Sequence, residues 1–266
     1  MTKRIISAIV ALLIFIPIII KGGPIFNIAV YIIGLLGLRE FINAKSKKKP
    51  LPFFITVISY IFLTLIILAD VSSSSTIYSL DYRVLAALFL ALLLPAVLYH
   101  DHKKYSIADA FYMMGGILFL GISMALLIMI RNIDLNIFVF LFTITITTDI
   151  FAYISGNLIG KHKLLTEISP NKTWEGLIIG TIMGVFVSSM FYHTCIDPNF
   201  SKVLLLLICT FLSLLGQFGD LAFSAIKRYF GIKDFSNIMP GHGGILDRLD
   251  SIIFVLLGFT FFINIL

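Results

Sequence analysis

The most polar stretch of this chain, residues 224–250, combines acidic, basic and glycine residues. Its candidates for chemistry are Lys227, Arg228, Lys233, Asp234, Gly241, His242, Gly243, Gly244, Asp247 and Asp250. Carboxylate oxygens are ligands that Mg²⁺ prefers, and Lys and Arg neutralise phosphate oxygens. Glycines before a helix let the backbone approach an anion, which the helix N-terminus favours. The set therefore predicts phosphate chemistry.

Two further carboxylates, Asp149 and Asp220, lie within long apolar runs. A charged residue near the centre of a membrane helix costs about 2.5–3.5 kcal/mol, so each should face a partner. Polar residues repeat around both carboxylates at helical spacing, which indicates one face on each helix. They are Thr145, Asp149, Tyr153 and Asn157 in one run, and Ser213, Gln217, Asp220, Ser224 and Lys227 in the other. Hydrogen bonding between helices is the alternative interpretation for Thr145, Ser213 and Gln217.

The elements that must position these residues are membrane helices. Of 266 residues, 59% are hydrophobic and 13% charged, whereas soluble domains average about 45–50% and about 25%. This excludes a soluble globular protein and a disordered chain, and two cysteines exclude a disulfide scaffold. Nine apolar runs predict an all-α polytopic membrane protein with about nine spans. The runs are Ile5–Ile20, Ile25–Ile42, Pro52–Ala69, Val84–Tyr99, Ile107–Ile130, Leu135–Ile159, Leu177–Cys195, Val203–Ile226 and Ser251–Leu266.

The distribution of positive charge predicts the orientation of these spans. Sorting the 20 Lys and Arg residues by alternate connections leaves only Lys21, Arg83, Arg131 and Lys202 on one side. The positive-inside rule then places the N-terminus in the cytoplasm and the C-terminus outside. The basic run Lys45–Lys49 is interpreted as an orientation signal beside anionic lipid. We expect one membrane domain over residues 1–266, with an apolar half (1–134) and a half that carries the motifs (135–266).

The polar stretch resembles the signature of the phosphatidate cytidylyltransferase family, the CDP-diacylglycerol synthases. The matching residues are Ser224, Lys227-Arg228, Lys233-Asp234, His242-Gly243-Gly244, Ile245, Asp247-Arg248, Leu249 and Asp250. Upstream segments 148–153, 168–176 and 216–220 fit the same family. The resemblance implies transfer of CMP from CTP to phosphatidate, which gives CDP-diacylglycerol and pyrophosphate. It also implies a cell-membrane enzyme whose active site faces the cytoplasm, a homodimer, and no nucleic-acid partner.

Roles for individual residues follow from this resemblance together with their chemistry. Asp220 and Asp247 are the expected ligands of Mg²⁺, and the set allows a second cation. The other expected catalytic residues are Lys227, Arg228, Asp149 and Asp250. The expected substrate-binding residues are Lys172, Ser224, His242, Gly243, Gly244, Lys233, Arg248 and Asn157.

Two other functions stay open at this point. One is a nucleotidyl or phosphoryl transferase that acts on another lipid phosphate, such as a polyprenyl phosphate. The other is a cation-coupled transporter, which would also keep acidic residues within its helices. The concentration of polar residues in the second half and in one loop favours an enzyme.

Overall fold

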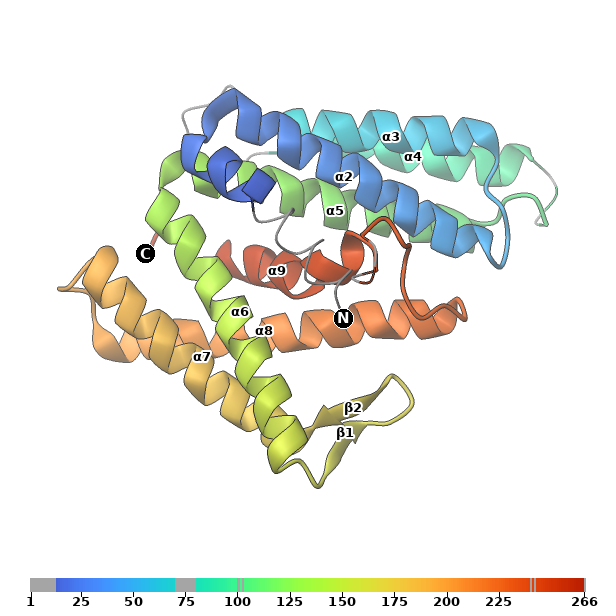
Figure 1. Cartoon of the computed structure of the whole chain (residues 1–266). Helices are drawn as coiled ribbons and strands as arrows, with labels where there is room; N and C mark the ends of the chain where they lie inside the picture. Colours follow the sequence, from blue (N-terminus) through green and yellow to red (C-terminus); the bar gives the residue numbers. More distant parts are fainter. Residues whose placement is uncertain are drawn as a thin grey trace. The chain divides into compact units, whose positions relative to one another are not determined.

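The computed structural model describes residues 13–69, 80–99, 101, 103–239, 241 and 243–265, most of them in helices. The chain forms two compact units. Figure 1 labels their helices and strands. The first contains the residues up to Ile133 together with Phe230–Asp247. The second contains Asp134–Tyr229 and Arg248–Leu266.

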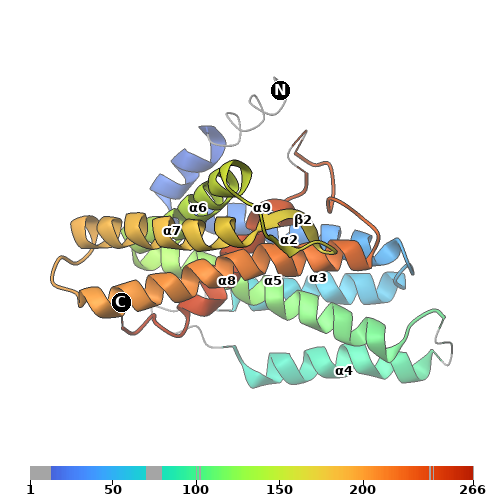
Figure 2. The same cartoon turned by 90° about the horizontal axis from the view of Figure 1, so that it is seen from below.

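The first unit is built around one long buried helix, α5 (Ile107–Ile133). Three helices pack along α5 (Figures 1 and 2), namely α2 (Gly23–Ser46), α3 (Phe53–Leu68) and α4 (Tyr82–Leu98). Glycine allows the closest of these approaches, because a Cβ on Gly116 of α5 would lie 2.2 Å from the Phe41 ring of α2. A further helical segment covers residues 13–21.

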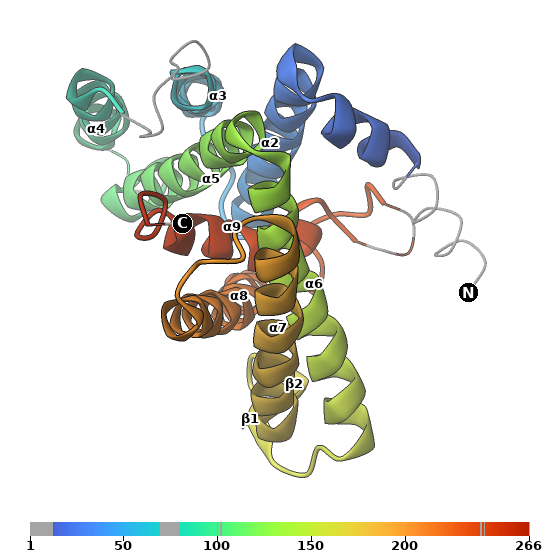
Figure 3. The ribbon, with the colours of Figure 1, turned by 90° about the vertical axis from the view of Figure 1, so that its left-hand side faces the viewer.

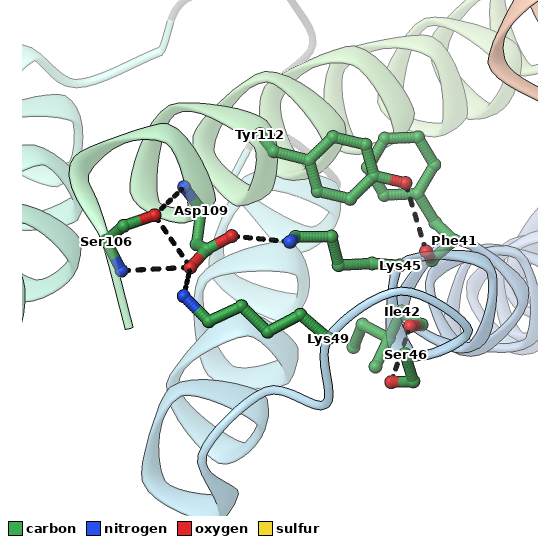
Figure 4. A network of polar contacts seen from close by, with 8 residues as sticks. All are labelled: Phe41, Ile42, Lys45, Ser46, Lys49, Ser106, Asp109 and Tyr112. Carbon is green, nitrogen blue, oxygen red and sulfur yellow. Dashed lines mark hydrogen bonds and ion pairs between the residues drawn. The ribbon is translucent and has the colours of Figure 1, made fainter. Parts of the chain in front are cut away.

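A buried ion cluster fixes the N-terminus of α5 to the C-terminal end of α2 (Figure 4). Asp109 and Ser106 form a capping box, in which the Ser106 backbone N–H donates to the Asp109 carboxylate at 2.9 Å. The same carboxylate binds Lys45 at 2.5 Å and also Lys49. Two lysines of the basic run therefore pair with a buried carboxylate, a role that the interpretation of the run as an orientation signal does not include.

Aromatic side chains extend this junction by one helical turn (Figure 4). The Tyr112 ring stacks on Phe41 with centroids 4.4 Å apart, and its hydroxyl donates to the Phe41 carbonyl at 3.1 Å. Phe230, the first residue after α8, packs edge-on against Tyr112. Phe230 is thus anchored to the aromatic pair of α2 and α5.

The second unit consists of three long helices, a hairpin and most of a short last helix. The long helices are α6 (Leu135–Leu158), α7 (Trp174–Cys195) and α8 (Lys202–Tyr229). The last helix is α9 (Leu246–Phe259). Figure 3 shows α6 and α7 side by side, and Figure 2 shows α8 along α7.

Glycines at every fourth position of α7 explain why α6 packs so closely against it. Gly176, Gly180 and Gly184 are buried. A Cβ on Gly180 would lie 2.7 Å from the Ala152 Cβ and 2.8 Å from the Thr148 carbonyl oxygen. Small residues spaced by four let two membrane helices approach backbone to backbone.

The hairpin between α6 and α7 is absent from the all-α prediction. Its strands are β1 (Lys163–Leu165) and β2 (Ser169–Thr173), paired antiparallel with Lys163 opposite Thr173. β2 leads directly into α7, where the Thr173 hydroxyl caps the helix by accepting from the Gly176 N–H at 3.1 Å. The hairpin is therefore held firmly at the start of α7.

The helices α2 to α8 follow the predicted apolar runs to within a few residues, whereas α9 begins five residues before the predicted last run, Ser251–Leu266, and ends seven residues before the end of that run. Among the described residues, α2, α5, α6, α7 and α8 are long and apolar enough to cross a membrane. The helices α3 and α4 have 16 and 17 residues, and α9 has 14. Half of the first predicted span, residues 5–12, lies outside the described residues.

We expect Gly180→Ala to loosen the α6–α7 packing, because the added methyl group has no space. It should lower the free energy of unfolding by about 2 kcal/mol, the usual cost of overpacking. Denaturant titration of the detergent-solubilised protein measures this change. The matched control is Gly115→Ala on α5, where an added Cβ meets nothing within 4 Å. Equal stabilities of the two variants would contradict the close packing of α6 and α7.

Candidate active site

The polar residues of α8 lie on one side of the helix, as their spacing predicts. Ser213, Gln217, Ser224 and Lys227 are buried, and Asp220 is partly accessible. On α6, Thr145 is buried, whereas Asp149, Tyr153 and Asn157 are exposed. The α6 set therefore covers a wider arc than one face.

The first two polar residues of this α8 set, Ser213 and Gln217, bind α8 to its neighbouring helices. The Ser213 and Thr148 hydroxyls are 2.8 Å apart, which links α8 to α6. The Gln217 amide donates to the Thr181 hydroxyl at 2.8 Å, which links α8 to α7. Interhelical hydrogen bonding is therefore the correct interpretation for Ser213 and Gln217. Thr145 instead donates to backbone carbonyls of its own helix.

One turn further along α8, Asp220 pairs with Lys172 of the hairpin. Lys172 on β2 places its Nζ 2.7 Å from the Asp220 carboxylate and 3.3 Å from the Gln217 carbonyl oxygen. The Ser224 hydroxyl donates to the other Asp220 oxygen at 3.3 Å. The Lys172 and Asp220 side chains are 26% and 33% exposed, so solvent or a ligand can reach this pair.

Two more carboxylates and a second lysine belong to the same electrostatic environment. Asp149 interacts with Asp220 and Lys172, and Asp250 interacts with Asp220, Asp149 and Lys227. We call this set the aspartate–lysine cluster; its members are Asp149, Lys172, Asp220, Lys227 and Asp250. The cluster therefore contains three carboxyl groups and two lysines.

The residue before Asp220 must be glycine for α9 to approach α8. A Cβ on Gly219 would lie 2.6 Å from the Asp250 carbonyl oxygen and 2.9 Å from the Phe254 ring. Because both contacts involve the segment that carries Asp250, this glycine lets the two aspartates belong to one cluster.

Carboxylate oxygens have the right chemistry for Mg²⁺, but the described residues do not supply a complete set of ligands. Across the described ranges, no three His, Cys, Asp or Glu side chains are grouped as a metal site. Mg²⁺ commonly binds one or two carboxylates and completes its shell with water and substrate phosphates. The cluster fits that type of site.

Asp247, the other expected metal ligand, organises the backbone around it. One of its carboxylate oxygens accepts hydrogen bonds from the Phe235 and Gly244 N–H groups, each at 2.9 Å. Gly243 has a φ of 84°, and a Cβ there would lie 2.9 Å from this carboxylate. Asp247 belongs to the first unit and Asp220 to the second, so their joint metal binding stays a prediction.

Comparisons with known proteins show the family of this chain. A model of the cytidylyltransferase family matches residues 2–266. The chain belongs to this family. It is similar to proteins named phosphatidate cytidylyltransferase from Staphylococcus saprophyticus and Staphylococcus haemolyticus, each 38% identical over 257 residues. A protein of the same name from Staphylococcus aureus is 37% identical over 260 residues, and all three alignments cover 96% of both chains.

In this cytidylyltransferase-family protein, the other predicted site residues have surroundings of their own. The Arg228 guanidinium donates to the Ile168 carbonyl at 3.3 Å and so holds the hairpin turn to the end of α8. Lys233 is exposed in the first unit, and Asn157 and Arg248 are exposed in the second. His242 lies outside the described residues.

Sequence reasoning missed Glu40, a fully buried carboxylate on α2. It accepts hydrogen bonds from the Ile245 and Leu246 N–H groups at the start of α9, each at 2.9 Å. The sequence did contain a signal for Glu40, because it is a single carboxylate in an apolar helix and such a group needs buried hydrogen-bond partners.

A double-mutant cycle tests the pairing of the hairpin with α8. We expect Lys172→Met and Asp220→Asn to be coupled by about 0.5–1 kcal/mol in unfolding free energy, a modest value because both side chains are partly exposed. The control is a second double-mutant cycle that combines Lys163→Met with Asp220→Asn, because Lys163 is exposed on the neighbouring strand. Equal coupling in the two cycles would rule out a specific pair.

Proposed function

We propose that this protein transfers CMP from CTP to phosphatidate and releases pyrophosphate. The observation that carries the proposal is the ion pair between Lys172 and Asp220 within the aspartate–lysine cluster. The cluster combines groups that bind phosphate with groups that bind cations, beside helices apolar enough for a membrane. The relatives named phosphatidate cytidylyltransferase support the choice of substrates.

The reaction needs positioning and charge neutralisation more than acid–base chemistry. A phosphate oxygen of phosphatidate attacks the α-phosphorus of CTP in line and forms a new P–O bond. The bond between the α-phosphorus and the bridging oxygen to the β-phosphate breaks, and pyrophosphate leaves with that electron pair. Because the attacking oxygen is already ionised, no strong general base is required. Lys172 and Lys227 would neutralise and orient the phosphates.

Mg²⁺ is proposed as the cofactor, with Asp220 and Asp247 as its ligands. When bound, the cation would offset the negative charge on the reacting phosphates. Asp149 and Asp250 would add negative charge nearby and favour cation binding. Support comes from the oxygen chemistry of these residues and from the excess of carboxylates over lysines in the cluster.

The proposal includes the arrangement in the cell membrane. Nine spans would place the N-terminus and the motif-bearing loops in the cytoplasm, where CTP is available, and the C-terminus outside. The bias of Lys and Arg toward alternate connections supports this orientation. We also propose a homodimer, on the family resemblance alone.

Labelled CTP tests the proposed reaction. Purified protein in detergent is offered phosphatidate, a polyprenyl phosphate or no lipid, each with Mg²⁺. We expect labelled CDP-diacylglycerol and an equal amount of pyrophosphate with phosphatidate only. Transfer to the polyprenyl phosphate instead would change the substrate, and cation-dependent uptake into vesicles without CTP turnover would indicate a transporter.

Asp220→Asn should lower this turnover about 100-fold or more, because it removes a charge expected to act on the reacting phosphates. Asp197→Asn is the matched control in the same unit, since Asp197 lies in the α7–α8 loop and accepts only a local bond from the Asn199 N–H. Similar turnover in the two variants would remove Asp220 from the mechanism.

A further inference from the structure

The N-terminus of α9 already holds an anion that belongs to the protein. The glycines before this helix predict a site for a substrate phosphate, yet the backbone N–H groups there have internal partners. Glu40 takes those of Ile245 and Leu246, and Asp247 takes that of Gly244. Glu40 thus occupies the position at which the helix favours negative charge.

Glu40 also binds the loop that precedes α9. Its Oε1 accepts from the Ser236 hydroxyl at 2.5 Å as well as from the Ile245 N–H, and its Oε2 accepts from the Leu246 N–H. One carboxylate on α2 therefore joins the middle of the α8–α9 loop (residues 230–245), at Ser236, to the end of the loop where α9 begins. Glu40 is 1% exposed, so solvent does not compete for these three hydrogen bonds.

Gly244 is required by this arrangement. A Cβ at Gly244 would lie 2.6–2.7 Å from the Glu40 carboxylate atoms. A side chain there would push Glu40 away from the loop, which gives this glycine a role that does not involve substrate contact.

We infer that Glu40 is a positioning residue, which fixes the α8–α9 loop in the conformation that binds CTP. A carboxylate with three donors, two of them backbone amides at a helix N-terminus, holds the loop through strong charge-assisted hydrogen bonds. The loop carries Gly243 and Gly244 and leads into Asp247 in the first turn of α9, so its conformation decides where these residues lie. The consequence for CTP rests on the proposed function, whereas the consequence for the backbone amides does not.

Two substitutions of similar size remove the hydrogen bonds to Glu40 in part or completely. Glu40→Gln keeps one acceptor oxygen but faces a donor with its amide nitrogen, and Glu40→Leu removes all acceptors. We expect exchange of the Ile245 and Leu246 amide hydrogens, measured by mass spectrometry, to accelerate in the order wild type, Gln, Leu. The Leu variant should exchange about tenfold faster or more, because each bond to a charged group contributes substantially.

Kinetics of the folded fraction should show the same order. The KM for CTP should rise about tenfold in Glu40→Leu and less in Glu40→Gln, while the KM for phosphatidate stays close to the wild-type value. Unchanged amide exchange, or loss of stability with an unchanged KM for CTP, would overturn the inference.

A milder pair of variants keeps the test decisive if Glu40→Leu fails to fold. Ser236→Ala removes one donor to Glu40, and we expect a severalfold rise in the KM for CTP. Ser46→Ala is the matched control on α2, because its hydroxyl bonds only the Ile42 carbonyl. Equal KM values for these two variants would overturn the inference. If the wild-type protein does not turn over CTP, the proposed function fails, and the amide exchange still decides the role of Glu40.

Discussion

Charged groups among apolar helices must be paired, and this constraint organises both units. An unpaired charge is costly in a low-dielectric environment, so each buried carboxylate needs donors of its own. Asp109 is bound by Lys45 and Lys49, and Glu40 by a hydroxyl and two backbone amides. Asp220 is bound by Lys172, but only partly covered. Because Lys172 and Asp220 are accessible, a substrate can replace the contacts within this pair, whereas the buried Asp109 and Glu40 keep theirs.

The fold also requires neighbouring segments to approach closely, and glycine permits this at the positions that hold the functional residues. In the second unit, Gly180 brings α7 against α6, and Gly219 brings α8 against the segment that carries Asp250. In the first unit, Gly244 makes room for Glu40. The glycines in the family motif therefore serve packing as well as the loop, and their positions follow from what lies opposite them.

Sequence spacing predicts α8 better than α6 for a geometric reason. Steps of four and three alternate on α8, so its polar residues stay on one side, and four of the five are buried. On α6 each step is four residues, which rotates the set by about 40° per step. Asp149 and Asn157 consequently lie outside the buried face, and Thr148 rather than Thr145 makes the hydrogen bond to α8.

Other parts of the site depend on contacts that local patterns do not encode. The hairpin strands have three and five residues, too few for a periodic signal, although the segment contains Lys172. Glu40 meets Ile245 across 205 positions of sequence, so no local motif links them. The family resemblance supplied the set of candidate residues, but it did not distinguish those that form the aspartate–lysine cluster from those that hold the backbone.

The most direct measurement of the central claim is the reactivity of Lys172 toward an amine-acylating reagent, read by mass spectrometry with and without CTP and Mg²⁺. If the aspartate–lysine cluster binds the nucleotide, CTP will protect Lys172 strongly and leave the exposed Lys163 of the same hairpin unchanged. Equal labelling of Lys172 in the presence and absence of CTP would contradict the account.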